Sequence, residues 1–131
     1  MQWLIDMVIA AIGVPPCYIP TDDFPGIWEP PGGWVKDGTW NTADVSAVVP
    51  ALATSINVDW KFQSDGVGGA IYLRPVGHVG FVHTCMARTL VADIWHNINT
   101  TISLDKNKQF QYRFLAGHVW EADFRIRGWW L

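Results

Sequence analysis

Two stretches of strict alternation between apolar and polar residues constrain the fold of this chain more than any other feature. In residues 55–62, apolar side chains occupy every second position and polar ones the positions between. The pattern returns near the C-terminus, where Trp120, Ala122, Phe124 and Ile126 alternate with acidic and basic residues. Successive side chains of a β-strand point to opposite faces, so each stretch predicts a strand with one face in a core and the other in water.

Short apolar runs separated by turn residues predict the remaining strands. The pair Asp65-Gly66, for example, is typical of a tight turn. The further strands that we expect are 70–74, 79–86, 90–95, 100–104 and 109–115. The last two should form a hairpin around a turn at 105–108. Short strands at this spacing, with no long helical pattern between them, indicate an antiparallel β-sandwich of jelly-roll type over residues 34–131.

Residues 1–33 differ from the rest of the chain. Apolar residues recur at helical spacing in residues 1–12 and the pattern stops at Gly13, which predicts a short helix. Residues 15–33 contain six prolines, so this arm should be extended and unpaired, lying along its own domain or a neighbour. Because a helix of about 12 residues is marginal alone in water, it must dock on its own domain or on a partner. The predicted interface residues are Trp3, Leu4, Met7, Val8, Ile12, Trp28 and Trp129.

The composition limits the class of protein. A chain of 131 residues suits one domain, and an apolar fraction of 50% excludes intrinsic disorder. The net charge of −3 argues against binding to a nucleic-acid backbone. The N-terminal segment lacks the basic residues of a signal peptide, and it is shorter than the about 20 apolar residues of a membrane span. Cys17 and Cys85 fit no zinc pattern, and the sequence leaves open whether they form a disulfide.

Patterns for catalysis and metal binding are sparse. The sequence lacks the common nucleophile, metalloprotease, phosphate-binding and dinucleotide-binding motifs. The acidic pair at 22–23 lies in the proline-rich arm, which would hold an acid/base pair poorly. His83 and Cys85 would share one strand face, and His78 and His96 are the other candidate metal ligands. A half-buried strand explains these residues without a metal, so we expect no enzyme activity, no metal and no cofactor.

Nine tryptophans in so short a chain indicate a use beyond the core. Trp60 and Trp120 occupy apolar-face positions and should be core residues. Other aromatic residues could stack on a sugar ring. The candidate ligand-binding residues are Trp34, Trp40, Tyr72 and Trp95.

Two consecutive tryptophans close the last strand. They must point to opposite faces, so one of them leaves the core. Continuing the alternation places Trp130 in the core and Trp129 on the charged face, although Gly128 would permit a bulge that exchanges them. We predict that Trp129 leaves the core and is covered by a neighbouring subunit or by the arm, with sugar stacking as the alternative.

Four segments carry a resemblance to known domains. They are DVSAVVP at 44–50, AIYLRPVG at 70–77, ISLDKNKQFQYR at 102–113 and FRIRGWW at 124–130. Over residues 40–131 the chain resembles small β-sandwich domains of bacteriophage tail fibres and virion appendages, and of some secreted bacterial proteins. The resemblance implies no catalytic residues and a structural or receptor-binding role on a particle surface, often as a trimer.

These observations favour a non-enzymatic structural or appendage protein of a phage virion, such as a tail-fibre, spike or capsid-associated component. We expect it to assemble through residues 1–33 as a homo-oligomer, preferably a trimer, with other virion proteins, and to contribute to attachment to the host receptor. The alternative is a secreted, extracellular lectin-like module that binds a cell-surface glycan through exposed tryptophans and Tyr72. The missing signal leaves a cytoplasmic protein, a virion component or another export route, without a membrane span.

Overall fold

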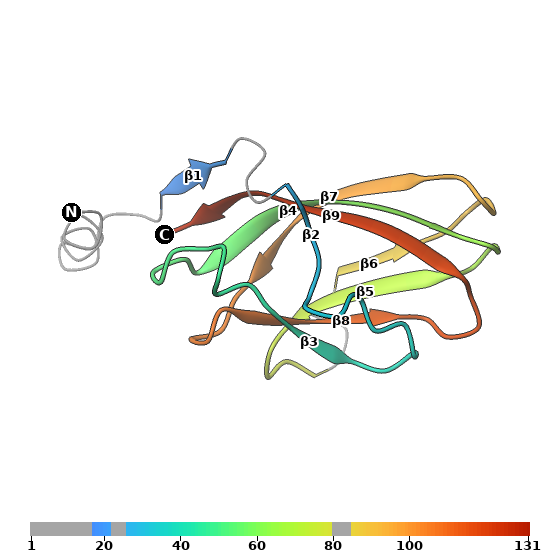
Figure 1. Cartoon of the computed structure of the whole chain (residues 1–131), viewed down its shortest axis with the longest axis horizontal. Helices are drawn as coiled ribbons and strands as arrows, with labels where there is room; N and C mark the ends of the chain where they lie inside the picture. The colour runs from blue at the N-terminus through green and yellow to red at the C-terminus, as the bar shows by residue number, and fades with distance from the viewer. Residues whose placement is uncertain (1–16, 22–25, 80–84) are drawn as a thin grey trace.

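The computed structural model of the chain describes residues 17–21, 26–79 and 85–131, which form nine β-strands and no helix (Figure 1). The strands are β1 (Tyr18–Pro20), β2 (Ile27–Trp28), β3 (Asn41–Asp44), β4 (Ser55–Ser64), β5 (Ala70–Pro75), β6 (Cys85–Arg88), β7 (His96–Ser103), β8 (Gln109–Phe114) and β9 (Trp120–Trp130). The prediction of an all-β, antiparallel fold is confirmed for these described residues. The helix predicted in 1–12 lies outside the described residues.

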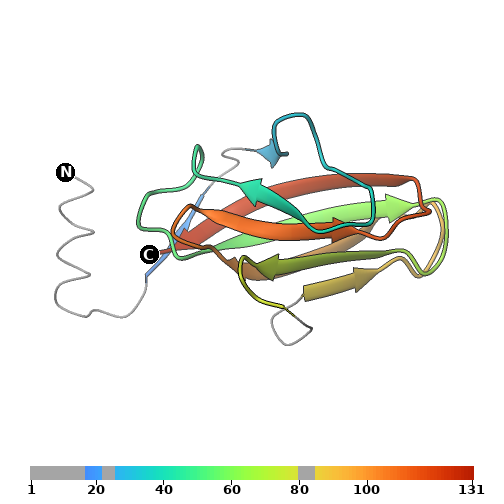
Figure 2. The ribbon, with the colours of Figure 1, turned by 90° about the horizontal axis from the view of Figure 1, so that it is seen from below.

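The strands form two antiparallel sheets packed face to face (Figure 2). One sheet has the order β1-β9-β4-β7, with β2 also paired to β9, and the other has the order β3-β8-β5-β6. Apart from the connections β1–β2 and β5–β6, each connection takes the chain from one sheet to the other. The hydrogen-bonded pairs β1·β9, β3·β8, β4·β7 and β5·β6 are therefore nested one inside the next along the chain.

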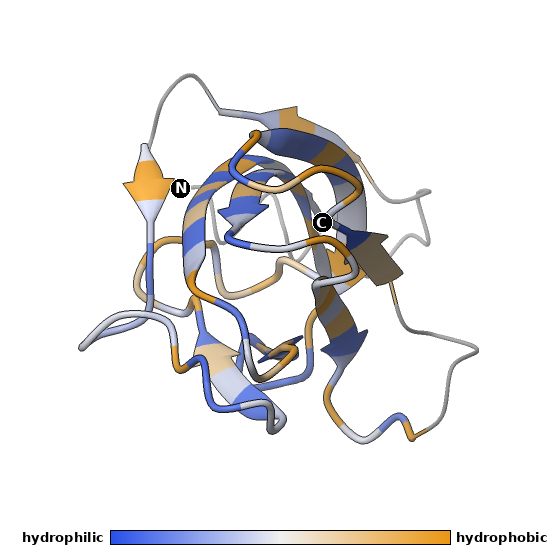
Figure 3. Ribbon diagram, turned by 90° about the vertical axis from the view of Figure 1, so that its right-hand side faces the viewer, coloured by the Kyte–Doolittle hydropathy of each residue, from blue (hydrophilic) through white to orange (hydrophobic). Residues whose placement is uncertain are grey.

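The core fills the space between the two sheets, and apolar and polar residues alternate along the strands that enclose it (Figure 3). Trp34, which precedes β3, packs into this core, with its ring centroid 4.7 Å from Tyr112 and 5.2 Å from Trp60. The largest fully buried side chains are Trp60, Tyr112, Phe62, Phe110, Phe114, Phe124, Ile56, Ile71, Leu73, Val45, Val58 and Thr89. The predicted inward positions of 55–62 and of Trp120, Phe124 and Ile126 are confirmed.

A β-bulge in β9 decides which of the two terminal tryptophans faces the core. Val58 pairs with Ile126 and Asn57 with Gly128, so Arg127 is an extra residue in the ladder. Beyond the bulge, Trp129 pairs with the buried Ile56 and packs against the core. The prediction that Trp129 leaves the core is therefore wrong, because the bulge exchanges the two faces.

Trp130 takes the outer face instead. Its ring lies 5.0 Å from that of Tyr18, centroid to centroid. The tryptophan that leaves the core is thus covered by a residue of the chain's own arm.

Two predicted strands differ from those observed. Residues 90–95 form turns, because Asp93 adopts a φ of 58° and donates its N–H to the Ser64 carbonyl at 2.8 Å, so an extended strand is wrong there. In the strand predicted at 79–86, Val79 is not in a strand, and the last two residues begin β6, which continues to Arg88. Residues 80–84 lie outside the described residues.

The predicted hairpin of 100–104 and 109–115 is also wrong. The turn at 105–108 exists, with the Lys108 N–H bonded to the Asp105 carbonyl at 3.0 Å. However, β7 pairs with β4, whereas β8 pairs with β3 and β5 in the other sheet. The turn therefore carries the chain across the sandwich, and its local sequence does not specify which strands pair.

Two described segments of the arm are paired, which corrects the prediction of an unpaired arm. Tyr18–Pro20 and Ile27–Trp28 both pair with β9. The pairing is possible because β1 and β2 are edge strands, where proline is tolerated. Among the described residues there is no helix long and apolar enough to cross a membrane, and Cys17 and Cys85 are free thiols.

Candidate functional site

The polar outer face of the five-stranded sheet carries two adjoining hollows, of about 500 Å³ and about 270 Å³. Three side chains line both of them: Lys61 from β4, Asn97 from β7 and Asp123 from β9. Lys61 pairs in register with each of the other two, so the three form one row across neighbouring strands. Trp95 and His96 complete the larger hollow; Asp59, Arg125 and Arg127 complete the smaller one. We refer to the two together as the Trp95 hollow.

A hydrogen-bonded set of side chains on the same face fixes the smaller part of the Trp95 hollow. The Asp59 carboxylate accepts bonds from Arg127 Nε at 2.5 Å and from Asn99 Nδ2 at 2.7 Å. Asn99 also exchanges two amide bonds with Asn57, at 3.1 and 3.2 Å. The bond from Arg127, followed by that from Asn99, holds the pKa of Asp59 below its usual value, so this carboxylate is charged at neutral pH.

His96 fixes the loop that presents Trp95. Its Nε2 accepts the Leu90 N–H at 3.1 Å, and its Nδ1 lies 2.9 Å from the Ile94 carbonyl, to which it must donate. The imidazole also stacks on Phe62, with ring centroids 5.6 Å apart. These contacts assign the neutral tautomer with the proton on Nδ1, and they give His96 a positioning role in place of metal ligation.

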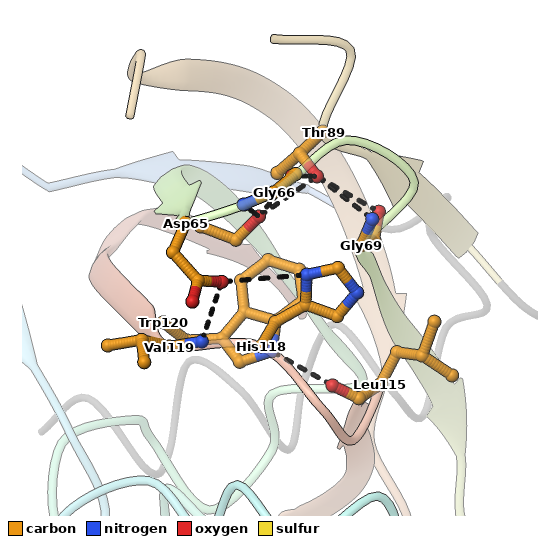
Figure 4. Close-up of polar contacts among 9 residues, drawn as sticks. Asp65, Gly66, Gly69, Thr89, Leu115, His118, Val119 and Trp120 are labelled. Atoms are coloured by element: carbon orange, nitrogen blue, oxygen red, sulfur yellow. Dashed lines mark hydrogen bonds and ion pairs between the residues drawn. The ribbon is translucent and has the colours of Figure 1, made fainter. Parts of the chain in front are cut away.

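The base of the same loop is bonded to the β4–β5 loop, which is bonded in turn to the β8–β9 loop (Figure 4). Thr89, which is fully buried, accepts the Gly69 N–H at 3.0 Å and donates to the Gly66 carbonyl at 2.9 Å. Asp65 accepts the Val119 N–H at 3.0 Å. A Cβ on Gly69 would come within 2.8 Å of the Trp120 ring, so the close approach of these loops requires glycine there. Trp95, with 46% of its surface exposed, is consequently presented by a well-supported loop.

The predicted ligand-binding residues lie in three separate places. Only Trp95 reaches the Trp95 hollow. Trp34 packs against the core, and Trp40 and Tyr72 make an edge contact, 6.1 Å between centroids, on the outer face of the other sheet. The structure does not bring the four residues together.

The predicted interface residues are only partly described. Trp3, Leu4, Met7, Val8 and Ile12 lie outside the described residues. Trp28 packs on the chain's own core, 5.8 Å from both Trp34 and Phe124 between ring centroids, and Trp129 does likewise. Both tryptophans therefore pack within a single copy of the chain and need no neighbouring copy to cover them.

The candidate metal ligands do not form a site in the described part of the chain. His83 lies outside the described residues, and His96 is bonded to backbone atoms. Among residues 17–21, 26–79 and 85–131, no group of three His, Cys, Asp or Glu side chains is placed to hold a metal ion.

Sequence reasoning missed Lys61, Asn97 and Asp123 as site residues. They occupy outward positions of the predicted strands, where a polar residue is expected in any case. They can be recognised as a group only from the pairing of β4 with β7 and with β9, and these three strands lie far apart in the sequence. Together they offer an ammonium, an amide and a carboxylate beside an exposed indole, a combination suited to a ligand with both hydroxyl groups and an apolar ring face.

No protein-family model matches the chain, and no curated protein matches it.

Proposed function

We propose that this chain is a non-enzymatic module of a bacteriophage virion appendage that binds a host-surface glycan at the Trp95 hollow. The observation that carries the proposal is the Trp95 hollow itself. An exposed indole at one end meets the row of Lys61, Asn97 and Asp123. A sugar stacks its C–H face on an aromatic ring, and its hydroxyls exchange hydrogen bonds with amide, carboxylate and ammonium groups.

The strand connectivity supports this class of protein. Nested antiparallel pairs, from β1·β9 on the outside to β5·β6 at the centre, correspond to one long hairpin folded over into two sheets. We infer from this order that the sandwich is a jelly roll, an architecture used by viral capsid domains and lectins. Because a fold alone does not fix a function, the proposal depends on the site and on the resemblance of residues 40–131.

The assembly of the module belongs to the same proposal. We infer that residues 1–12 form the predicted helix and join copies of the chain, a trimer by preference, or bind another virion protein. Their apolar composition and the pairing of Tyr18–Pro20 with β9, which ties the arm to the sandwich, support this inference. Exposed apolar residues on the loops beside Trp95, including Val67, Leu90 and Val119, offer a second contact surface.

A secreted lectin-like module is the second candidate, and the Trp95 hollow supports it equally. The two candidates differ in assembly, because a lectin domain acts as a monomer as well as in an oligomer. Light scattering on the full chain separates them: a stable oligomer favours the appendage, and a monomer that binds glycan favours the extracellular lectin.

Glycan binding by the full chain tests the site. We expect a positive signal on an array of bacterial surface saccharides. In calorimetric titration with the best ligand, Trp95→Ala should weaken binding about tenfold, equivalent to about 1.4 kcal/mol. Leu52→Ala, which also truncates an exposed apolar residue but lies outside the Trp95 hollow and the loops beside it, is the matched control and should bind like the wild type. Absence of any glycan ligand, or unchanged binding by Trp95→Ala, would contradict the proposal.

A further inference from the structure

The outer face of the four-stranded sheet carries a second ordered cluster, on the side of the sandwich opposite the Trp95 hollow. Tyr72 pairs in register with Arg113, and Arg74 with Gln111. These residues alternate with buried ones along β5 and β8, so their side chains point away from the core. Trp40 lies beside them, immediately before β3. We call this set the arginine face.

Each arginine is held in place by an aromatic ring and by one hydrogen bond. The Arg74 guanidinium carbon lies 3.8 Å from the centroid of Trp40, and its Nε donates to Gln111 Oε1 at 2.8 Å. The Arg113 guanidinium carbon lies 5.7 Å from the centroid of Tyr72, and its Nε donates to the Gly38 carbonyl at 2.6 Å. Stacking and the Nε bond together restrict the rotation of both side chains.

The terminal amino groups of both arginines are unused in the described part of the chain. A guanidinium has five N–H donors, and each of these two spends only the one on Nε. Neither Arg74 nor Arg113 forms an ion pair with a carboxylate in the described part of the chain.

The charge on this face is opposite in sign to the net charge of the whole chain. Arg88 on β6 is exposed and pairs with Ala70, so it adds a third cation to the same face. The carboxylate on these strands is Asp44, which accepts bonds from the Ser46 N–H and from Gln109. The Asp37 carboxylate, in the loop before β3, accepts hydrogen bonds from Thr39 and Asn41. These three arginines outnumber the two carboxylates, so the arginine face is positive on a protein whose net charge is −3.

We propose that the arginine face binds the oxyanion groups of an acidic polysaccharide, through the free N–H groups of Arg74 and Arg113. A planar guanidinium donates two parallel bonds to a carboxylate or sulfate, and side chains that are already ordered lose little entropy on binding. A nucleic acid is a poorer match, because its backbone is bound by a longer basic stripe than these arginines provide. The proposal is independent of the Trp95 hollow, since no residue is shared between the two sites.

The test compares three polymers with the full chain: polygalacturonate, dextran sulfate and neutral dextran. We expect both acidic polymers to bind and neutral dextran not to bind at this face. Arg74→Gln and Arg113→Gln should each weaken acidic-polymer binding about tenfold, whereas Arg74→Lys, which keeps the charge but loses the planar fork, should weaken it less. Thermal melting of each variant checks that the fold is retained, and Arg74→Lys keeps the test valid if a glutamine variant unfolds.

Two controls separate the site from general charge effects. Lys106→Gln removes the same charge from an exposed turn and should bind like the wild type. Arg74→Gln should leave binding of the array glycan at the Trp95 hollow unchanged, because Arg74 does not line that hollow, so failure at one site is distinguishable from failure at the other. Equal losses for Lys106→Gln and Arg74→Gln, or equal binding of all three polymers, would overturn the proposal. Binding of inorganic sulfate without binding of either acidic polymer would overturn the polysaccharide as the ligand.

Discussion

At the scale of single residues, the tryptophans of this chain differ in how their indole nitrogens are satisfied. Trp120 is buried and donates its Nε1–H to the Leu115 carbonyl at 3.0 Å. Trp60 is fully buried, yet its Nε1 has no hydrogen-bond partner in the described part of the chain. Trp60 contributes through ring packing alone, with Phe114 and Phe124 at 5.7 and 5.2 Å between centroids. The alternation in the sequence predicts both as core residues but does not distinguish these two situations.

Replacing Trp120 tests the role of a tryptophan that is both buried and hydrogen-bonded. Trp120→Ala should lower the free energy of unfolding by about 3–5 kcal/mol, the usual range for a large buried aromatic. Trp130→Ala is the matched control, because this ring lies on the outer face against Tyr18, and its loss should cost about 0.5–1.5 kcal/mol for the aromatic pair. Urea unfolding of both variants measures the difference. Equal losses for the two would mean that the outer tryptophan is as important to the fold as the inner one.

At the scale of elements, the sequence predicts strands well where one face is buried and poorly where the chain turns. The alternation in β4 and β9 follows directly from burial on one side, and both strands lie where it predicts them. In contrast, the apolar run at 90–95 resembles a strand, but His96 and Ser64 hold its backbone in turns. The bond from Asp93 to Ser64 joins the loop to β4, which lies far away in the sequence, so the local sequence could not reveal it.

The candidate site, too, could be predicted only in part from the sequence. Trp95 could be selected from the sequence as an aromatic outside the expected core. The residues around it could not, because Lys61, Asn97 and Asp123 come together only through the pairing of three strands. The position of Trp129 also depended on one inserted residue, Arg127, since a single bulge reverses every side chain beyond it.

The ladder of polar side chains on β4, β7 and β9 should make stability depend on acid pH. Bonds from Arg127 and Asn99 hold the pKa of Asp59 below its usual 3.8 in the folded chain. The stabilisation is therefore fully present above the unfolded-state pKa and is lost as the pH falls through the lower folded-state pKa. In urea unfolding between pH 6 and pH 2.5, the stability gap between the wild type and Asp59→Asn should be largest near neutrality and should close under acid.

Comparing the wild type with Asp59→Asn separates the effect of Asp59 on stability from the effects of other carboxylates. Hydrogen bonds from Thr39 and from Ser46 likewise lower the pKa of Asp37 and of Asp44, and both groups will contribute to acid unfolding of either protein. Their contributions cancel in the difference between the wild type and Asp59→Asn. A gap that stays constant down to pH 2.5 would show that the charge on Asp59 does not stabilise the fold.

At the scale of the whole molecule, the two proposed binding faces and the start of the described arm lie on different parts of the sandwich. The Trp95 hollow and the arginine face lie on opposite sheets. The arm begins at the end of β9 away from the Trp95 loop, where the Leu131 N–H bonds to the Cys17 carbonyl at 3.0 Å (Figures 1 and 2). Since β9 has 11 residues, about 30 Å separates its two ends. The first described residue, Cys17, therefore lies at the end of the sandwich away from the Trp95 loop.

Assembly through the N-terminal segment is the last prediction, and the arrangement of the arm dictates how to test it. Deleting residues 1–33 would remove β1, β2 and Trp28 from the sandwich, so a loss of assembly would be confused with a loss of stability. Substitution in the full chain avoids this difficulty. Leu4 and Val8 lie four positions apart, on one face of the predicted helix, and Leu4→Asp with Val8→Asp would place two charges in any apolar contact there.

We expect light scattering to give an oligomeric mass for the wild type and a monomeric mass for the double variant, with the melting of the sandwich retained in both. Gln2→Asp, which adds a charge at a polar position of the same segment, should keep the oligomeric mass. A monomeric wild type, or an unchanged mass for the double variant, would contradict assembly through this segment. Since neither proposed binding face includes residues 1–12, a monomeric variant that still binds glycan would separate assembly from recognition.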